Sequence, residues 1–121
     1  MNMTKAELLS NLDQFIGTQY YYPLWPTVFL TDGTKYLSET AGCYWLMDAI
    51  ASHLKYLQSS QAFVCCKFTC QDSRGHLIMT DGNETNLAKQ RIPFTDFPIS
   101  EITLYGCHEV DKWIILLPSE Y

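Results

Sequence analysis

The feature that most restricts the fold is residues 39–57, a stretch with helical periodicity and almost no polar side. A helix that is apolar nearly all round is buried on more than one side. We therefore expect this helix to pack on a sheet while either the aromatic residues at 20–26 or a second subunit covers its outer flank. The main apolar stripe contains Cys43, Leu46, Met47, Ile50, Leu54 and Leu57, and the adjacent flank contains Trp45, Ala49 and Tyr56.

The N-terminal part of the chain predicts a second helix over residues 4–16. Thr4 and Glu7 form a capping box, in which each side chain binds backbone N–H groups of the first turn. Gly17 follows where a C-terminal cap belongs. With the stretch at 39–57, the sequence predicts two helices in all.

A β-hairpin is predicted around Asp32-Gly33, with strands at 28–30 and 35–37, because apolar residues lie on both sides of this turn-forming pair. The last apolar run, 113–117, shows no alternation, so we expect it at the centre of the sheet with both faces covered. Runs rich in β-forming residues predict further strands near 62–70, 76–80, 87–92 and 99–105.

These elements predict one α+β domain spanning residues 1–121. Its two helices would pack on a mostly antiparallel sheet of about five to seven strands, in the order α-β-β-α-β-β-β-β-β. The composition, 47% apolar and 17% charged, is typical of a globular protein.

Charge and composition disfavour several classes of protein. The net charge is −5, and the densest basic pair is Lys89 with Arg91, so nucleic-acid binding is disfavoured. It would require Lys67, Lys89 and Arg91 to meet aromatic residues on one sheet face. No segment reaches the roughly 18 apolar residues of a membrane span, and no signal sequence is recognisable. Five cysteines without regular spacing indicate reduced thiols and a cytoplasmic location.

The leading functional candidate is the segment 20–26, where aromatic residues stand close to two prolines. Tyr20, Tyr21, Tyr22 and Trp25 cannot all face inward if the segment is extended, and Tyr and Trp dominate the energetics of protein interfaces. We therefore expect a non-enzymatic interaction module that uses these four residues to bind a protein partner or a second copy of itself, as a homodimer. In the alternative interpretation, the segment covers the helix at 39–57.

A small thiol- or zinc-dependent enzyme is the alternative function. Cys43 lies near a predicted helix N-terminus, where the helix dipole lowers the pKa of a thiol. A nucleophilic cysteine also needs a histidine as base. His53 is too far along the same helix to serve, so His76 or His108 would have to come from the sheet.

The remaining cysteines offer a possible zinc site made of Cys65, Cys70 and Cys107, with His108 beside the last. Structural zinc sites usually take paired ligands two to four residues apart. Cys65 and Cys66 are adjacent, so on a strand they point to opposite faces and cannot both join one site. Buried, apolar cysteines are the favoured interpretation, and we assign no metal.

The segment Thr95-Asp96-Phe97-Pro98 is a possible loop site centred on Thr95 and Asp96. A loop-stabilising role is favoured over a catalytic one, since Asp commonly bonds its own backbone in loops. Asp32 and Asp81 are explained in the same way. The six glycines are scattered singly and form no phosphate-binding loop, so no cofactor and no catalytic residue is assigned.

Five sets of residues distributed along the chain form a recognisable combination: Phe15–Thr18, Thr31–Gly33 with Lys35–Leu37, Ala41–Ala51, Thr95–Pro98 and Leu117–Tyr121. Together they resemble a family of small bacterial proteins of unknown function found in cyanobacteria and on plasmids and phages. The resemblance spans nearly the whole chain and implies an accessory or counter-defence role on a mobile element. That family has no assigned activity, so the resemblance transfers no functional residue.

Overall fold

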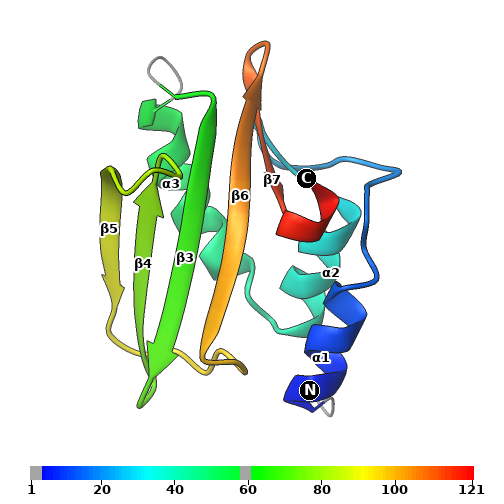
Figure 1. Cartoon of the computed structure of the whole chain (residues 1–121), viewed down its shortest axis with the longest axis vertical. Coiled ribbons are helices and arrows are strands. Elements are labelled where there is room, and N and C mark those ends of the chain that lie inside the picture. The colour runs from blue at the N-terminus through cyan, green and yellow to red at the C-terminus, as the bar shows by residue number, and fades with distance from the viewer. Residues whose placement is uncertain (1–3, 58–60) are drawn as a thin grey trace.

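The computed structural model describes residues 4–57 and 61–121. Helices α2 (Asp32–Thr40) and α3 (Tyr44–Leu57) lie behind one seven-stranded sheet, and α1 (Lys5–Leu12) lies beside its lower end (Figure 1). The predicted α+β class is confirmed. The predicted pair of helices and the element order are wrong, because a third helix stands where a strand was expected.

The sheet has the spatial order β1-β2-β7-β6-β3-β4-β5, and every neighbouring pair is antiparallel except β2 with β7. The strands predicted between residues 62 and 117 all form, with their ends shifted by a few residues. The bounds are β1 (Tyr22–Trp25), β2 (Val28–Leu30), β3 (Phe63–Gln71), β4 (Arg74–Thr80), β5 (Asn86–Ile92), β6 (Glu101–Glu109) and β7 (Lys112–Leu116).

Helix α1 begins as predicted but ends four residues early. The Thr4 hydroxyl accepts a 3.1 Å hydrogen bond from the Glu7 N–H, as the capping box requires. The helix then ends at Leu12, so the predicted C-terminal cap at Gly17 is wrong. Beyond the helix, the Phe15 ring packs on Tyr36 of α2, with ring centroids 5.3 Å apart.

The predicted hairpin at Asp32-Gly33 is wrong, because these residues open helix α2. Thr31 is the N-cap and forms a capping box with Thr34, whose hydroxyl also donates a 2.8 Å hydrogen bond to the Ile115 carbonyl of β7. The actual partner of β2 in the hairpin is β1, which lies at the sheet edge and contains Pro23. A residue without an N–H is tolerated at such an edge.

The apolar stretch at 39–57 is divided by Gly42 and does not form one helix. Gly42 has φ of +63°, a left-handed conformation that ends α2, and the Cys43 N–H bonds back to the Ser38 carbonyl at 2.9 Å. Helix α3 therefore begins at Tyr44, and residues 39–40 belong to α2.

Helix α3 is covered on more than one side, but largely by a different segment from the one expected. Its Trp45 ring packs edge-on against Phe68 of β3 and Phe97 of the loop between β5 and β6, at 5.5 and 6.5 Å between centroids. From the aromatic segment, Trp25 reaches α3, where its Nε1 donates a 3.0 Å hydrogen bond to Asp48. The chain thus supplies the cover that the sequence required.

Strand β7 is central, between β2 and β6, and both of its faces are covered, as predicted. Trp113 and Ile115 are fully buried on the face that carries α2 and α3. Ile114 and Leu116 are also buried, on the opposite face. We call this second face the open face, because none of the α-helices in the described part of the chain lies over it (Figure 1).

The carboxylate of Glu120 fastens the end of the chain to the first turn of α2. Its Oε1 accepts hydrogen bonds from the Thr31 hydroxyl (2.6 Å) and the Leu117 N–H (2.9 Å), and its Oε2 accepts one from the Gly33 N–H (3.0 Å). A carboxylate is favourable at the positive end of the helix dipole. This arrangement places the short 3₁₀ helix η1 (Pro118–Glu120) beside α2.

Gly33 allows the end of the chain, at Leu117 and Glu120, to lie close against the first turn of α2. A Cβ at this position would lie 2.5 Å from Leu117 Cδ1 and 2.7 Å from Glu120 Oε1. We expect Gly33→Ala to lower the free energy of unfolding by about 1–3 kcal/mol, since an added methyl group forces its neighbours apart. Urea denaturation measures this change.

The matched control is Gly17→Ala. At Gly17 no atom lies within 4 Å of the place that an added methyl group would occupy, and φ is not left-handed. Its substitution should therefore change the stability by less than about 1 kcal/mol. Equal losses of stability in the two variants would contradict the assigned contact between Gly33 and the chain end.

Candidate functional site

The aromatic segment 20–26 has an anchored part and an exposed part. Tyr22 and Trp25 are half-buried against the core, whereas Tyr20 and Tyr21 are 58% and 54% exposed. The two interpretations of this segment therefore apply to different residues. Trp25 helps to cover α3, and Tyr20 and Tyr21 present their rings to solvent.

Asp32 anchors the chain on either side of these two tyrosines. Its Oδ2 accepts a 2.7 Å hydrogen bond from the Gln19 N–H, and its Oδ1 accepts one of 2.9 Å from the Tyr22 hydroxyl. In turn, the Asp32 N–H donates to the Thr18 hydroxyl at 2.8 Å. The hydrogen bond from Gln19, with that from Tyr22, lowers the pKa of Asp32 from its ordinary value.

Tyr21 and Tyr121 line a hollow of about 220 Å³ on the open face above β7, which we call the tyrosine hollow. Tyr121 is held there because its ring packs edge-on against both Phe63 and Tyr105, at 5.4 Å between centroids in each case. The rest of the lining combines apolar groups with carboxylates and hydroxyls: Thr18, Thr31, Cys107, Glu109, Ile114, Leu116 and Glu120.

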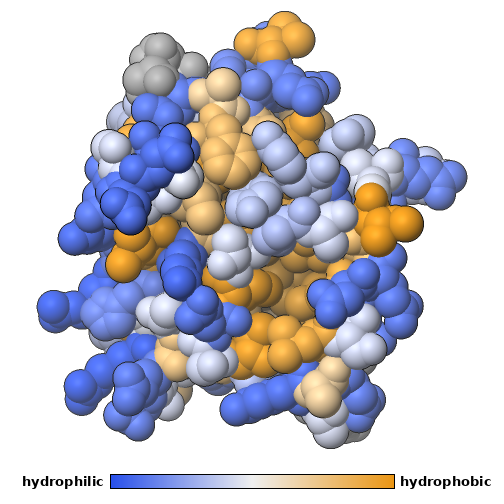
Figure 2. All heavy atoms as spheres, viewed as in Figure 1, coloured by the Kyte–Doolittle hydropathy of each residue, from blue (hydrophilic) through white to orange (hydrophobic). Residues whose placement is uncertain are grey.

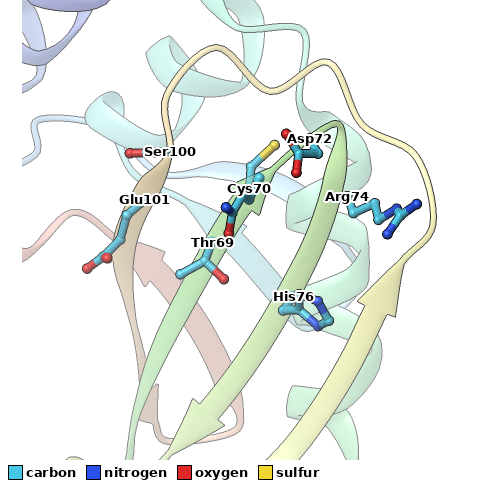
Figure 3. Close-up of a pocket in the computed structure, with 8 residues that line it drawn as sticks. Thr69, Cys70, Asp72, Arg74, His76, Ser100 and Glu101 are labelled. Carbon is cyan, nitrogen blue, oxygen red and sulfur yellow. The ribbon is translucent and has the colours of Figure 1, made fainter.

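A second, polar hollow of about 510 Å³ lies on the open face near the Gln71 end of β3 (Figure 3). Thr69 and His76 are directly paired neighbours on β3 and β4 there. The Cys70 thiol is directed away from the His76 ring (Figure 3). In the described residues no hydrogen bond joins any cysteine to a histidine, so this hollow holds no preformed thiol–base pair.

Cys43 precedes α3 as predicted, but its thiol is fully buried. Burial raises the pKa of Cys43 to about 12, and the thiol donates a 3.6 Å hydrogen bond to the Leu37 carbonyl. Desolvation therefore outweighs the helix dipole. The group is a neutral thiol at physiological pH, which does not favour it as a nucleophile.

The other cysteines are divided between the two faces of the sheet. Cys65 and Cys107 lie on the open face and Cys66 is buried on the helix face, and burial raises the pKa of all three thiols. Cys70 lies seven residues along β3 from the position opposite Cys107, or about 23 Å away. Within residues 4–57 and 61–121 there is no cluster of three potential metal ligands.

The loop residues Thr95 and Asp96 differ in their surroundings. Thr95 is buried, its hydroxyl accepts a 3.1 Å hydrogen bond from the Phe97 N–H, and its own N–H donates to the Ser73 carbonyl at 2.8 Å. Asp96 is exposed and accepts no hydrogen bond from the described residues. Thr95 therefore stabilises the loop, whereas the Asp96 carboxylate is directed to solvent.

Basic side chains gather on the part of the open face formed by β3, β4 and β5. Lys67 and Lys89 lie on either side of Ile78 in one row across the strands, and Arg91 lies next to His76 in the following row. Lys67 is paired with Glu101 of β6 at 3.2 Å. The three cations share one face with the aromatic rings of Phe63 and Tyr105, but those rings pack on Tyr121 in other rows.

A family model described as a family of unknown function (DUF6876) matches residues 6–121. The chain belongs to the DUF6876 family. The predicted membership of an uncharacterised family is thereby confirmed. No curated protein and no solved structure matches the chain. None of the helices in the described part of this DUF6876 protein is long and apolar enough to cross a membrane.

Sequence reasoning missed three residues that shape the candidate site of the DUF6876 protein. Asp32 was interpreted as a turn residue, and Glu120 and Tyr121 were not considered individually. The pair Thr31-Asp32 carries a usable signal, because Thr is a typical N-cap residue and Asp is favoured in the first turn of a helix. No local signal shows that Glu120 would meet that helix.

We expect the Asp32 anchor to make stability depend on pH. Because the folded-state pKa of Asp32 lies below its ordinary value of 3.8, its contribution is complete above that value and is lost as pH falls through the folded-state pKa. Asp32→Asn should therefore be less stable than the wild type near pH 7, and the difference should shrink below about pH 4. Chemical denaturation across this range measures it, with Asp96→Asn as the control that should not differ from wild type.

The cysteines should differ in their reactivity toward a thiol reagent. Cys43 and Cys66 are buried, so both should resist iodoacetamide at about pH 8 in the folded protein, whereas the partly exposed Cys65, Cys70 and Cys107 should be modified first. Mass spectrometry of digested peptides identifies the modified sites. Rapid labelling of Cys43 would restore it as a candidate nucleophile.

Proposed function

We propose that this DUF6876 protein is a non-enzymatic interaction module that binds a protein partner at the tyrosine hollow. The proposal depends on a contrast within the segment 20–26, between an exposed ring and the fixed residues around it. Tyr21 is more than half exposed, yet its neighbours Gln19 and Tyr22 are both fixed by Asp32. When a partner buries an aromatic ring, little conformational entropy is lost if the backbone around that ring is already fixed.

The chemistry of the hollow favours a basic side chain of the partner. Ile114 and Leu116 supply apolar contacts for its aliphatic part, and Glu109 supplies a negative charge. Tyr21 and Tyr121 can pack against a cation through their ring faces. An arginine or lysine on the partner surface meets all three features, in keeping with the net charge of −5 of this protein.

The proposed setting is the bacterial cytoplasm. Five cysteines without a disulfide are consistent with a reducing compartment, and the resemblance to plasmid and phage proteins supports an accessory or counter-defence role on a mobile element. The partner is a different protein or a second copy of this chain, which would form a homodimer.

Co-purification from the native host tests the proposal. Tyr21→Ala should fold normally, because its ring is largely exposed, and should lose the co-purifying partner or the dimer. Tyr56→Ala is the matched control, since Tyr56 is 77% exposed on α3, away from the hollow, and it should retain the partner. Sedimentation of the purified protein separates the two kinds of partner.

Two outcomes would oppose this function. If Tyr21→Ala still binds the partner, the tyrosine hollow is not part of the interface. If Tyr21→Ala unfolds, the segment 20–26 is a structural cover of the core. Trp25→Ala shows what loss of a structural side chain looks like. It removes the hydrogen bond to Asp48 and should lower the melting temperature.

A further inference from the structure

Half of strand β6 lacks a neighbour on the side that faces α1. Strand β7 pairs with β6 only between Tyr105 and Glu109, so Glu101–Leu104 pair with β3 alone. In the same register, the residue opposite Thr103 would be Pro118, which has no N–H and begins η1. The Leu117 N–H is bonded to Glu120. An unpaired strand edge therefore lies within the seven-stranded sheet.

Neighbouring hydrogen bonds identify the backbone groups that face this edge. The His108 N–H donates to the Ala62 carbonyl at 2.9 Å, and the Ser100 carbonyl accepts from the Cys70 N–H at 2.8 Å, so even-numbered residues of β6 bond toward β3. Backbone groups alternate in direction along an antiparallel strand. The N–H and C=O of Thr103 therefore point toward α1, and neither has a hydrogen-bond partner among the described residues.

An apolar groove of about 240 Å³ adjoins this edge, between β6, α1 and η1. Figure 2 shows it as recessed hydrophobic surface in the lower part of the molecule. Leu9 of α1 is 47% exposed there and Pro118 of η1 is also exposed, whereas the other apolar groups are buried in the lining. Asp13 adds a carboxylate on the α1 side, whereas Glu101 on the β6 side is already paired with Lys67. The apolar lining consists of Leu9, Leu12, Ile102, Leu117 and Pro118.

We propose that an extended peptide segment of a partner protein binds in this groove as an added strand beside Thr103. Unpaired N–H and C=O groups at a strand edge are satisfied by an extended backbone, whereas a helix already satisfies its own groups. Alternate side chains of the added strand would enter the apolar groove, and a lysine or arginine would pair with Asp13. This β-strand addition uses a different surface from the tyrosine hollow, so either proposal can fail alone.

Selection from a phage-displayed library of random dodecapeptides provides the probe. We expect the enriched peptides to alternate apolar and polar residues and to carry a basic residue, and the most enriched one would be synthesised. Hydrogen exchange followed by NMR then reports on the edge itself. In the free protein the Thr103 amide should exchange faster than that of Leu104, which faces β3, and binding of the peptide should slow Thr103 exchange at least about tenfold.

Two variants test the groove and the edge separately. Leu9→Glu removes the exposed apolar wall, and Thr103→Pro removes the outward N–H without breaking a bond to β3. Each should weaken the affinity for the selected peptide by about tenfold or more. Ile16→Glu makes the same change of charge at a position that is 84% exposed and outside the groove, and it should bind normally, as should Tyr21→Ala.

Three results would overturn the proposal. One is failure of the library to yield a peptide that depends on Leu9. Another is binding that leaves the exchange of the Thr103 amide unchanged, which would place the peptide elsewhere. The third is a dimer in sedimentation that Thr103→Pro converts to a monomer, because the edge would then be occupied by a second copy of the chain.

Discussion

The hydrogen bonds between the Glu120 carboxylate and the first turn of α2 determine the arrangement of both candidate surfaces. They draw the chain out of the sheet directly after β7 and hold η1 beside α2. Tyr121 is thereby placed over the open face, where it completes the tyrosine hollow with Tyr21. Because the chain turns away at Leu117, it also leaves the edge of β6 at Thr103 without a neighbour. One carboxylate thus has two consequences, at different positions along β6.

Burial decides which of the polar and reactive groups can act. A helix N-terminus favours a thiolate, but the low polarity around Cys43 has the larger effect and keeps its thiol neutral. The more accessible Cys65 and Cys107 share the open face, and neither is hydrogen-bonded to a histidine of the described chain. The exposed groups that the structure holds firmly are aromatic rings and a strand edge, and both are suited to binding another chain.

The sequence predicted best those elements whose signal is local. Strands after residue 60 were found from their β-forming runs, and the burial of β7 on both faces followed from residues 113–117. The errors arose where a tertiary contact or a single backbone conformation decided the outcome. Asp32-Gly33 is typical of a hairpin, but the Thr31 cap and the distant Glu120 make it a helix start. Gly42 divided the apolar stretch through its left-handed conformation, and α1 ended at Leu12, beyond which Phe15 packs on Tyr36.

The candidate site was predicted only in part, for the same physical reason. The exposure of Tyr20 and Tyr21 agrees with the expectation that not all four aromatic residues face inward. Their companion Tyr121 lies at the far end of the sequence, and the groove at β6 depends on where β7 ends. Both features arise from contacts between distant parts of the chain, which no local pattern of residues reveals.

The parallel pairing of β2 with β7 also affects how the protein is made. Strands β1 and β2 join the rest of the sheet only through β7, which follows all the other strands in the sequence. During synthesis on the ribosome, the apolar residues of β2 and α3 are therefore present before the strand that completes their sheet. Unpaired apolar strands are prone to aggregate at this stage. Loss of β7 would leave β1 and β2 without their connection to the sheet, so the apolar residues of β2 would lack their strand partner.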